Sequence, residues 1–240
     1  MKKTEISIQK ITNNDFLECI DMAALEAVYD VYLNCSKEFR ISCTPENLEE
    51  LIMGRLYTEK RISGTEEMKE IIIREQEKEI HIKTEKEAGE SQKKNQGKKK
   101  CYEGEAMTLF AAADKIFENP GELFRETGCA HCCALWKDGE ILCCFEDIGR
   151  HNALDKAVGR ALLQRVSLED CVVFTSGRVS SDYLQKIVHA EIGTVVSRAA
   201  VTDLAADLAR RNKITLYGFV RKGKGNCYSK ETFSGKGVSA

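Results

Sequence analysis

The fold of this chain is decided by residues 171–220, CVVFTSGRVSSDYLQKIVHAEIGTVVSRAAVTDLAADLARRNKITLYGFV. Its short runs of β-branched and apolar residues, CVVFT, TVVS and ITLYGFV, predict strands. Between them apolar residues recur at helical spacing, which predicts one helix from Ser181 and another capped by Thr202. Strands that alternate with helices predict a mainly parallel sheet covered by helices on both faces. The fold class is therefore α/β.

Upstream of this stretch the pattern predicts a hairpin and two more helices. The runs CCALW and ILCCF flank the tetrapeptide KDGE at 137–140, and an Asp-Gly pair between apolar runs predicts a tight β-hairpin. Side chains alternate along a strand, so Cys143 and Cys144 are expected on opposite faces, where each packs and the two cannot share a metal ion. The helices are predicted at residues 107–117 and after Asn152, which is expected to cap the second one.

The N-terminal third predicts a small α+β unit, residues 1–82. Two strands are expected within residues 27–43, followed by a helix capped by Thr44 and by one further strand at 71–82. The composition changes at residues 83–101, where KTEKEAGESQKKNQGKKK contains no large apolar residue, and this predicts a flexible basic loop. Residues 102–240 form the predicted α/β cofactor-binding domain.

Composition and charge limit the classes of function. The 240 residues carry a formal net charge of −2, so the chain is not built to coat nucleic acid or an acidic membrane. No apolar run follows the N-terminal lysines and none approaches the roughly 18 residues of a membrane span, so we expect neither a secretory signal nor a membrane anchor. A cytoplasmic location follows, in which the eleven cysteines stay reduced. The isolated cysteines are expected to pack as small hydrophobic residues; they are Cys19, Cys35, Cys43, Cys171 and Cys227.

Three polar segments follow predicted strands, and each combines glycine with arginine or lysine. They are EDIGRHN (146–152), TSGR (175–178) and RKGKG (221–225). In open α/β sheets, ligands bind outside the carboxyl ends of the strands, where glycine lets the backbone approach and helix N-termini attract anions. The three segments together predict a phosphate-bearing ligand. Each alone could be an ordinary turn, and none is a P-loop or a GxGxxG fingerprint.

Thiols are densest in TGCAHCC, residues 127–133. Cys129 and Cys132 form a CxxC pair, in which one thiolate can attack and its neighbour can resolve the intermediate, so sulfur or electron transfer is one interpretation. With His131 the pair could instead bind zinc, but a tetrahedral site needs three or four ligands and the chain has no second CxxC. No metal site is therefore assigned, and a zinc-dependent hydrolase is kept as an alternative.

Four motifs give the chain a family resemblance. They are TGCAHCCAL (127–135), FEDIGRHNALDKAVGRAL (145–162), TSGRVSSDYLQKIV (175–188) and LYGFVRKGKGNCYS (216–229). In this order they resemble the successive motifs of the FdhD family of formate dehydrogenase accessory proteins. EDIGRHNALDK is the most specific, because no turn or helix cap requires that whole string. A weaker resemblance covers residues 27–62, where TPENLEELIMGRLYTEKRI is similar to the family's early helix.

The resemblance implies a sulfur carrier required for formate dehydrogenase activity, acting in molybdenum cofactor biosynthesis, rather than a metabolic enzyme. The family takes persulfide sulfur from a cysteine desulfurase and passes it to the molybdenum bis(molybdopterin guanine dinucleotide) cofactor before the cofactor is inserted, which implies sulfurtransferase activity. The expected partners are the desulfurase, a formate dehydrogenase and, optionally, a second copy of the chain in a homodimer. The implied fold is a cytidine-deaminase-like three-layer α/β/α sandwich.

The resemblance also assigns the cofactor-binding residues. The stretch that matches the family's cofactor-contacting segment comprises Phe219, Val220, Arg221, Lys222, Gly223 and Lys224. Its cationic side chains would meet the phosphates of a guanine dinucleotide, and Arg150 and Arg178 are expected beside them.

The chain departs from the family pattern at the persulfide cysteine. The family carries it in a CxxC on a loop before a TGG-x-H segment, and the corresponding loop here has no CxxC. One substitute is Cys101, whose thiolate the lysines at 98–100 would favour. The other, which we prefer, is the pair Cys129 and Cys132. A chaperone that binds and delivers the cofactor without sulfur transfer is the chief alternative function.

Overall fold

The structure, a computed structural model, describes residues 2–85 and 99–230; the core of the predicted basic loop at 83–101 lies outside them. The elements in chain order are β1 (Lys3–Thr12), β2 (Asp15–Ala24), β3 (Ala27–Leu33), β4 (Ser36–Cys43), α1 (Leu48–Thr58), the 3-10 helix η1 (Thr65–Glu67), β5 (Met68–Arg74), β6 (Glu79–Thr84), α2 (Ala106–Glu118), α3 (Glu122–Thr127), β7 (His131–Lys137), β8 (Glu140–Asp147), α4 (Arg150–Leu163), β9 (Val172–Thr175), α5 (Ser181–His189), β10 (Thr194–Ser197), α6 (Asp203–Arg211), β11 (Thr215–Arg221) and β12 (Lys224–Ser229).

The central sheet has six strands in the order β12-β11-β10-β9-β7-β8. Strands β9, β10 and β11 are parallel, as predicted, whereas β7 pairs antiparallel with both β8 and β9, and β12 pairs antiparallel with β11. The prediction of a mainly parallel sheet is therefore wrong. Two tight hairpins, β7–β8 and β11–β12, add antiparallel neighbours to both sides of the parallel strands. The first turns at Asp138 and Gly139, both with positive φ, as an Asp-Gly hairpin requires.

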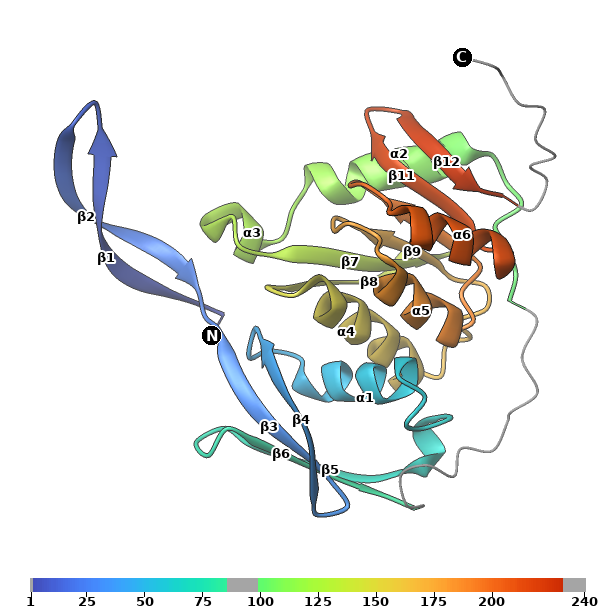
Figure 1. The fold of residues 1–240 in the computed structure, drawn as a ribbon, viewed down its shortest axis with the longest axis horizontal. Coiled ribbons are helices and arrows are strands. Elements are labelled where there is room, and N and C mark those ends of the chain that lie inside the picture. Colours follow the sequence, from blue (N-terminus) through green and yellow to red (C-terminus); the bar gives the residue numbers. More distant parts are fainter. Residues whose placement is uncertain (1, 86–98, 231–240) are drawn as a thin grey trace.

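Helices cover both faces of this sheet (Figure 1). Helix α2 packs on one face against residues such as Trp136, Phe174 and Tyr217. Helices α4, α5 and α6 pack on the other face in a larger core that includes Leu135 and Val195. The mixed α/β class with a three-layer arrangement is thus confirmed, while the cytidine-deaminase-like description stays a prediction.

A second sheet, with strand order β4-β3-β6-β5, packs on α1, and α1 in turn packs on α4 (Figure 1). Helices α1 and α4 cross at two glycines. A Cβ on Gly54 would lie 1.8 Å from the carbonyl oxygen of Asp155, and a Cβ on Gly159 would lie 1.9 Å from that of Glu50. This close crossing joins the N-terminal elements to the central sheet through a continuous layer of helix.

Several local predictions in the N-terminal third are wrong. The single strand expected at 71–82 is a hairpin, β5 and β6, because the polar run between them turns with Lys78 in the left-handed region. The helix cap expected at Thr44 is Asn47 instead. Thr44 is buried, and its amide donates to the Asp147 carboxylate at 3.2 Å, a long-range contact that local propensity does not encode.

The first two strands form a long antiparallel ribbon, which was not among the elements predicted from the sequence. Strands β1 and β2 pair over their whole length and project from the body of the protein (Figure 1). Across the two described ranges, no helix combines the length and the apolar character needed to cross a membrane.

Candidate functional site

The carboxyl ends of β8, β9, β10 and β11 lie at one edge of the central sheet, because β8 runs antiparallel to β7 and β7 runs antiparallel to β9. We call this the carboxyl edge, formed by residues 146–152, 175–178, 197–199 and 221–225 and by the amino end of β7. All three polar segments predicted from the sequence lie there. Strands are about 4.8 Å apart, so the edge extends roughly 14 Å from β7 to β11.

Arg150 begins α4 at this edge and leaves part of its guanidinium without a protein partner. Its Nη2 donates to Ser180 Oγ at 3.3 Å, but its buried Nε finds no hydrogen-bond partner among the described residues. A buried cationic donor of this kind needs an acceptor, which an anionic ligand would supply. Gly177 packs tightly here, since a Cβ on it would lie 2.9 Å from Arg150 Cβ.

His131, the first residue of β7, lies in the same cluster. The pKa of His131 is lowered, first by burial and then by the charges of Arg150 and Arg178. The imidazole is therefore neutral in an electropositive setting. Arg178 is exposed, so its guanidinium is available to a ligand.

The turn after β9 is fixed to β7 by a reciprocal pair of hydrogen bonds. Ser176 N donates to the Cys132 carbonyl at 3.0 Å, and Cys132 N donates to Ser176 Oγ at 2.9 Å. Ser197 Oγ, at the end of β10, donates to the Gly177 carbonyl at 2.9 Å. These bonds hold the Ser-Gly-Arg turn rigidly against the strand that carries Cys132.

The β11–β12 hairpin holds the residues assigned to cofactor binding. Arg221, Lys222 and Lys224 are exposed, whereas Val220 is buried in the core. Asp114 of α2 accepts the amides of Lys222 and Gly223, at 2.7 and 2.9 Å, so the turn is already capped by a carboxylate. Its cationic side chains, rather than its amides, are thus the groups left to meet an anion.

A cavity of about 290 Å³ lies beside this hairpin. It is lined by basic residues together with acidic and apolar ones: Asp114, Phe117, Glu118, Arg198, Val220, Arg221 and Lys222. Arg198 Nη1 donates to the Phe117 carbonyl at 2.8 Å, which fixes the guanidinium at the cavity wall. Phe219 precedes the lining residue Val220 in the chain but does not itself line the cavity; it is 38% exposed, with φ at +54°. An exposed ring in the same hairpin as exposed arginine and lysine residues suits a nucleotide.

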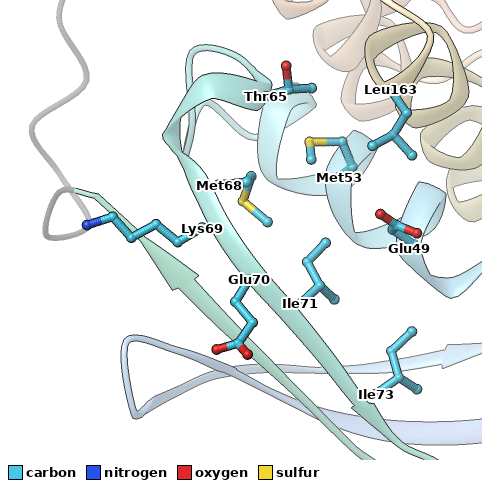
Figure 2. Close-up of a pocket in the computed structure, with 9 residues that line it drawn as sticks. All are labelled: Glu49, Met53, Thr65, Met68, Lys69, Glu70, Ile71, Ile73 and Leu163. Atoms are coloured by element: carbon cyan, nitrogen blue, oxygen red, sulfur yellow. The ribbon is translucent and has the colours of Figure 1, made fainter.

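A second cavity, of about 310 Å³, lies far from this edge, between α1 and β5 (Figure 2). Its walls include the thioether side chains of Met53 and Met68, and Figure 2 shows both pointing toward the gap between helix and strand. None of the predicted site residues lines it.

The candidate cysteines lie at opposite edges of the sheet. Cys129 and Cys132 are at the carboxyl edge, where Cys129 is exposed and Cys132 is partly buried. Cys101 lies at the amino ends of the parallel strands, where its Sγ is 3.2 Å from the carbonyl oxygens of both Gly193 and Lys213. The structure therefore does not bring Cys101 to the predicted cofactor-binding residues.

A thiol outside the predicted set contacts Cys132. Cys132 Sγ lies 3.9 Å from Cys144 Sγ of β8. Their hydrogen bond raises the pKa of Cys132 strongly, with burial adding to the rise, and it lowers the pKa of Cys144. Either sulfur can donate this hydrogen bond, and the directions of the two pKa shifts favour the Cys144 thiolate accepting from the Cys132 thiol.

The packing roles predicted for the other cysteines are confirmed only in part. Cys143 packs against the core on the α4 face, as predicted, but Cys144 lies on the opposite face and is exposed, so its packing role is wrong. Cys43 and Cys171 are buried as expected. Cys35 is exposed, because it lies in the β3–β4 turn. Within residues 2–85 and 99–230 no group of three or more His, Cys, Asp or Glu side chains could hold a metal ion.

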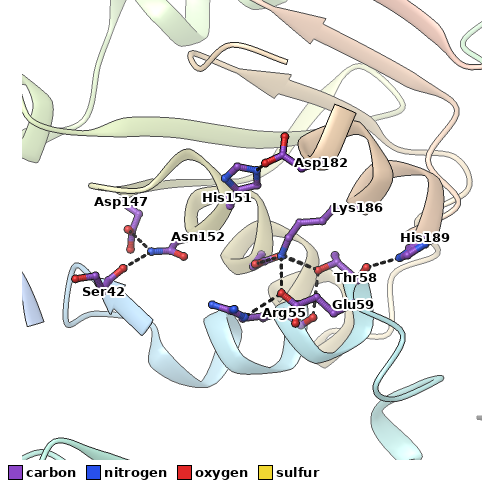
Figure 3. Close-up of polar contacts among 11 residues, drawn as sticks. Ser42, Arg55, Thr58, Glu59, Asp147, His151, Asn152, Asp182, Lys186 and His189 are labelled. Atoms are coloured by element: carbon purple, nitrogen blue, oxygen red, sulfur yellow. Dashed lines mark hydrogen bonds and ion pairs between the residues drawn. The ribbon is translucent and has the colours of Figure 1, made fainter. Parts of the chain in front are cut away.

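A buried polar network positions the start of α4. Asp147 accepts from Lys156 Nζ at 2.6 Å, from Gly149 N at 2.9 Å and from Asn152 Nδ2 at 2.9 Å. Asn152 Nδ2 also donates to the Ser42 carbonyl at 2.7 Å (Figure 3), so Asn152 joins β4 to α4. Asn152 does not cap the helix, as had been predicted; Gly149 is at the cap position.

A second network joins α5 to α1 and α4 (Figure 3). Lys186 Nζ lies 2.5 Å from the buried Asp155 carboxylate, and Thr58 Oγ1 donates to the same carboxylate at 2.8 Å. The two networks fix the helices whose N-termini face the carboxyl edge.

The fold and the carboxyl edge define an α/β protein that presents cationic groups, an aromatic ring and thiols along one edge of its central sheet, an arrangement suited to an anionic ligand and to sulfur chemistry. Comparison with known proteins gives the family. Residues 24–119 and 105–233 match the FdhD/NarQ family, and the chain belongs to that family.

Relatives and a solved structure agree with this assignment. The chain is 32% identical to the sulfur carrier protein FdhD of Listeria monocytogenes serotype 4b (strain F2365), over 92% of this chain and 95% of the relative. It is 32% identical to the sulfur carrier protein FdhD of Bacillus subtilis (strain 168), over 87% and 88%. A crystal structure described as a formate dehydrogenase accessory protein from Desulfotalea psychrophila superimposes with a TM-score of 0.81 at 26% identity, covering 96% of this chain and 98% of that one.

Proposed function

We propose that this chain is a sulfur carrier required for formate dehydrogenase activity. It takes persulfide sulfur from a cysteine desulfurase and passes it to the molybdenum bis(molybdopterin guanine dinucleotide) cofactor before the cofactor is inserted. The observation that carries the proposal is the meeting of thiols and available cationic groups at the carboxyl edge, in a chain whose relatives are named sulfur carriers.

The cofactor in this reaction is the sulfur acceptor, and therefore a substrate. Its phosphates need cationic donors, and Arg150 has a buried Nε that no described protein group satisfies. Arg178, Arg221 and Lys222 are exposed at the same edge. The exposed ring of Phe219 can stack on a guanine base, because stacking on an aromatic face is favourable for any base.

The thiols supply the sulfur chemistry. A persulfide forms when a thiolate attacks the outer sulfur of a donor persulfide, so the carrier needs a reachable thiol near the bound acceptor. Cys129 and Cys132 meet this requirement by position, since both lie where β7 enters the carboxyl edge. The reducing cytoplasm is the compartment proposed, because all eleven cysteines are free thiols.

The test is restoration of formate dehydrogenase activity in a bacterial host that lacks its own protein of this family. The wild-type chain and a Cys35→Ala control should both restore activity, whereas a variant with Cys101, Cys129, Cys132 and Cys144 changed to alanine should not. Binding of guanosine diphosphate, measured by calorimetry, should be unchanged in that variant. If the variant restored activity as well as the wild type, the chain would be a cofactor chaperone without sulfur transfer.

A further inference from the structure

Cys144 combines exposure with a thiol partner, although no motif in the sequence singles it out. We propose that Cys144 is the thiol that accepts sulfane sulfur in this chain, and that Cys132 positions and activates it. This inference rests on the proposed sulfur carrier function and assigns the reacting atom within it.

The first observation is the geometry of the thiol pair. Cys144 Sγ and Cys132 Sγ are 3.9 Å apart, across the β7–β8 ladder. Ala134 is the residue directly opposite Cys144, so Cys132 is its diagonal neighbour on the same face. Two thiols at this separation can share a proton through a hydrogen bond, and this bond stabilises the thiolate form of one of them.

The second observation is access. Strand β8 is an edge strand of the central sheet. Helix α2 covers the face that carries Cys144, but it packs over residues of β7 and of β9 to β11 and not over β8. Leu142 and Cys144 of β8 are therefore exposed, whereas Glu146, which lies opposite Cys132 on the same face, is partly buried. A donor persulfide can reach Cys144 without any rearrangement of the core.

The third observation is the charge around the pair. The Cys132 thiol lies within hydrogen-bond distance of Cys144 Sγ, and an S–H donated from Cys132 would stabilise the Cys144 thiolate, in agreement with the lowered pKa of Cys144. The charged group facing the pair is Glu146, which opposes ionisation of Cys144. Glu146 accepts the amides of Leu123 and Phe124 at the start of α3, at 3.0 and 3.1 Å, and these bonds reduce its repulsive effect. Cys144 remains the more acidic thiol of the pair.

The alternative pair, Cys129 and Cys132, lacks this geometry. Cysteines in CxxC motifs approach each other when the motif turns into a helix, whereas Cys132 lies in the extended strand β7. Cys129 and Ala130 precede that strand, and the hydrogen bonds among the described residues include none between the sulfur atoms of Cys129 and Cys132. The sulfur that Cys132 contacts is that of Cys144.

The reaction at Cys144 balances without an oxidant or a reductant. The Cys144 thiolate attacks the outer sulfur of a donor persulfide or of inorganic polysulfide, and a new S–S bond forms on Cys144. The S–S bond of the donor breaks, and the donor sulfur leaves as a thiolate or a shorter polysulfide that takes up a proton. Cys144 is about three residues, or roughly 10 Å, from the carboxyl end of β8. The loaded sulfur would therefore lie on the β8 side of the carboxyl edge, the side on which Arg150 begins α4.

The test uses inorganic polysulfide as the donor, so that it does not depend on a desulfurase. The full chain is loaded, persulfides are blocked by alkylation, and the modified peptides are identified by mass spectrometry. Sulfur is expected on the peptide that contains Cys144, with more than tenfold less in Cys144→Ala and no change in Cys143→Ala, its partly buried neighbour on the opposite face. Cys35 is the matched control for exposure, because it is exposed but has no thiol partner among the described residues, and it should load more slowly than Cys144.

The positioning role of Cys132 has its own readout. Alkylation of Cys144 is followed against pH, and in Cys132→Ala its midpoint should move to higher pH while the circular dichroism spectrum and thermal midpoint stay unchanged. An unchanged midpoint in Cys132→Ala would overturn the role given to Cys132. Equal loading of Cys144→Ala, with the sulfur on Cys129, would overturn this inference and leave the proposed function standing. If polysulfide loaded Cys144 but a desulfurase did not, the role of Cys144 as sulfur acceptor would stand and the proposed function would fail.

Discussion

Replacement of Lys156 by methionine should be among the most destabilising single changes at the carboxyl edge. Lys156 and Asp147 are both fully buried, with 2.6 Å between Nζ and Oδ2. The carboxylate also accepts from Thr44 N, Gly149 N and Asn152 Nδ2, so the variant would leave a buried charge with three neutral donors. Breaking a buried pair from one side costs about 3–5 kcal/mol, and we expect about 3 because those three bonds remain.

The assay is urea denaturation followed by the fluorescence of Trp136, the single tryptophan, which is 6% exposed. The matched control is Lys83→Met, which removes an exposed ion pair with Glu70 and should cost less than about 1 kcal/mol. In the double variant with Asp147→Asn the loss should be smaller than the sum of the two single losses, because no charge is left buried. A loss for Lys156→Met as small as that of Lys83→Met would refute the reasoning.

Three further predictions concern the helix crossing and the ligand edge. Gly159→Ala should cost at least about 1–3 kcal/mol in the same denaturation assay, because its Cβ would overlap the Glu50 carbonyl; a neutral effect would mean that α1 and α4 can move apart. Arg198→Met should weaken binding of guanosine diphosphate by about tenfold, as expected for loss of a charged donor worth about 1.5 kcal/mol. Lys83→Met is the control and should bind the nucleotide as the wild type does. Equal affinity of Arg198→Met and the wild type would exclude the cavity beside Arg198 as the nucleotide site. The pKa of His131, measured by NMR, should lie below the usual histidine range. Its contribution to stability is therefore present above the pKa of the unfolded chain and is lost as pH falls through the folded pKa. Guanosine diphosphate should raise the folded pKa, and no response to the nucleotide would place the phosphates elsewhere.

The elements with strong local signals could be predicted from the sequence. The Asp-Gly hairpin follows from a turn that requires positive φ, and the helix from Asp203 begins at Thr202, whose hydroxyl accepts from Ala205 N as expected. The apolar runs of β9, β10 and β11 are buried on both faces, which is why they form parallel neighbours.

Predictions failed where distant contacts decided the outcome. Asparagine is favoured at helix caps, yet the side-chain amide of Asn152 donates instead to the Ser42 carbonyl and to the Asp147 carboxylate. The strand order of the central sheet depends on the pairing of β7 with β9, and no local pattern encodes that pairing.

The role inferred for Cys144 depends on a β-bulge. Counted outward from the turn, Lys137 pairs with Glu140 and Trp136 with Ile141, and regular pairing would place Cys144 opposite Cys133. The register shift between Leu135 and Trp136 instead places it opposite Ala134, on the face of Cys132. One extra residue thus determines which thiol Cys144 contacts, and the sequence gives no signal for it.

The most direct test of the sulfur carrier proposal is to incubate the purified chain with a cysteine desulfurase and cysteine, and then to measure its intact mass before and after reduction. We expect the wild-type chain to gain the mass of one sulfur atom, to lose it on treatment with a thiol reductant, and to gain none when the desulfurase is omitted. A chain that stays unmodified beside a desulfurase shown to load another protein of the FdhD/NarQ family would contradict the proposed function.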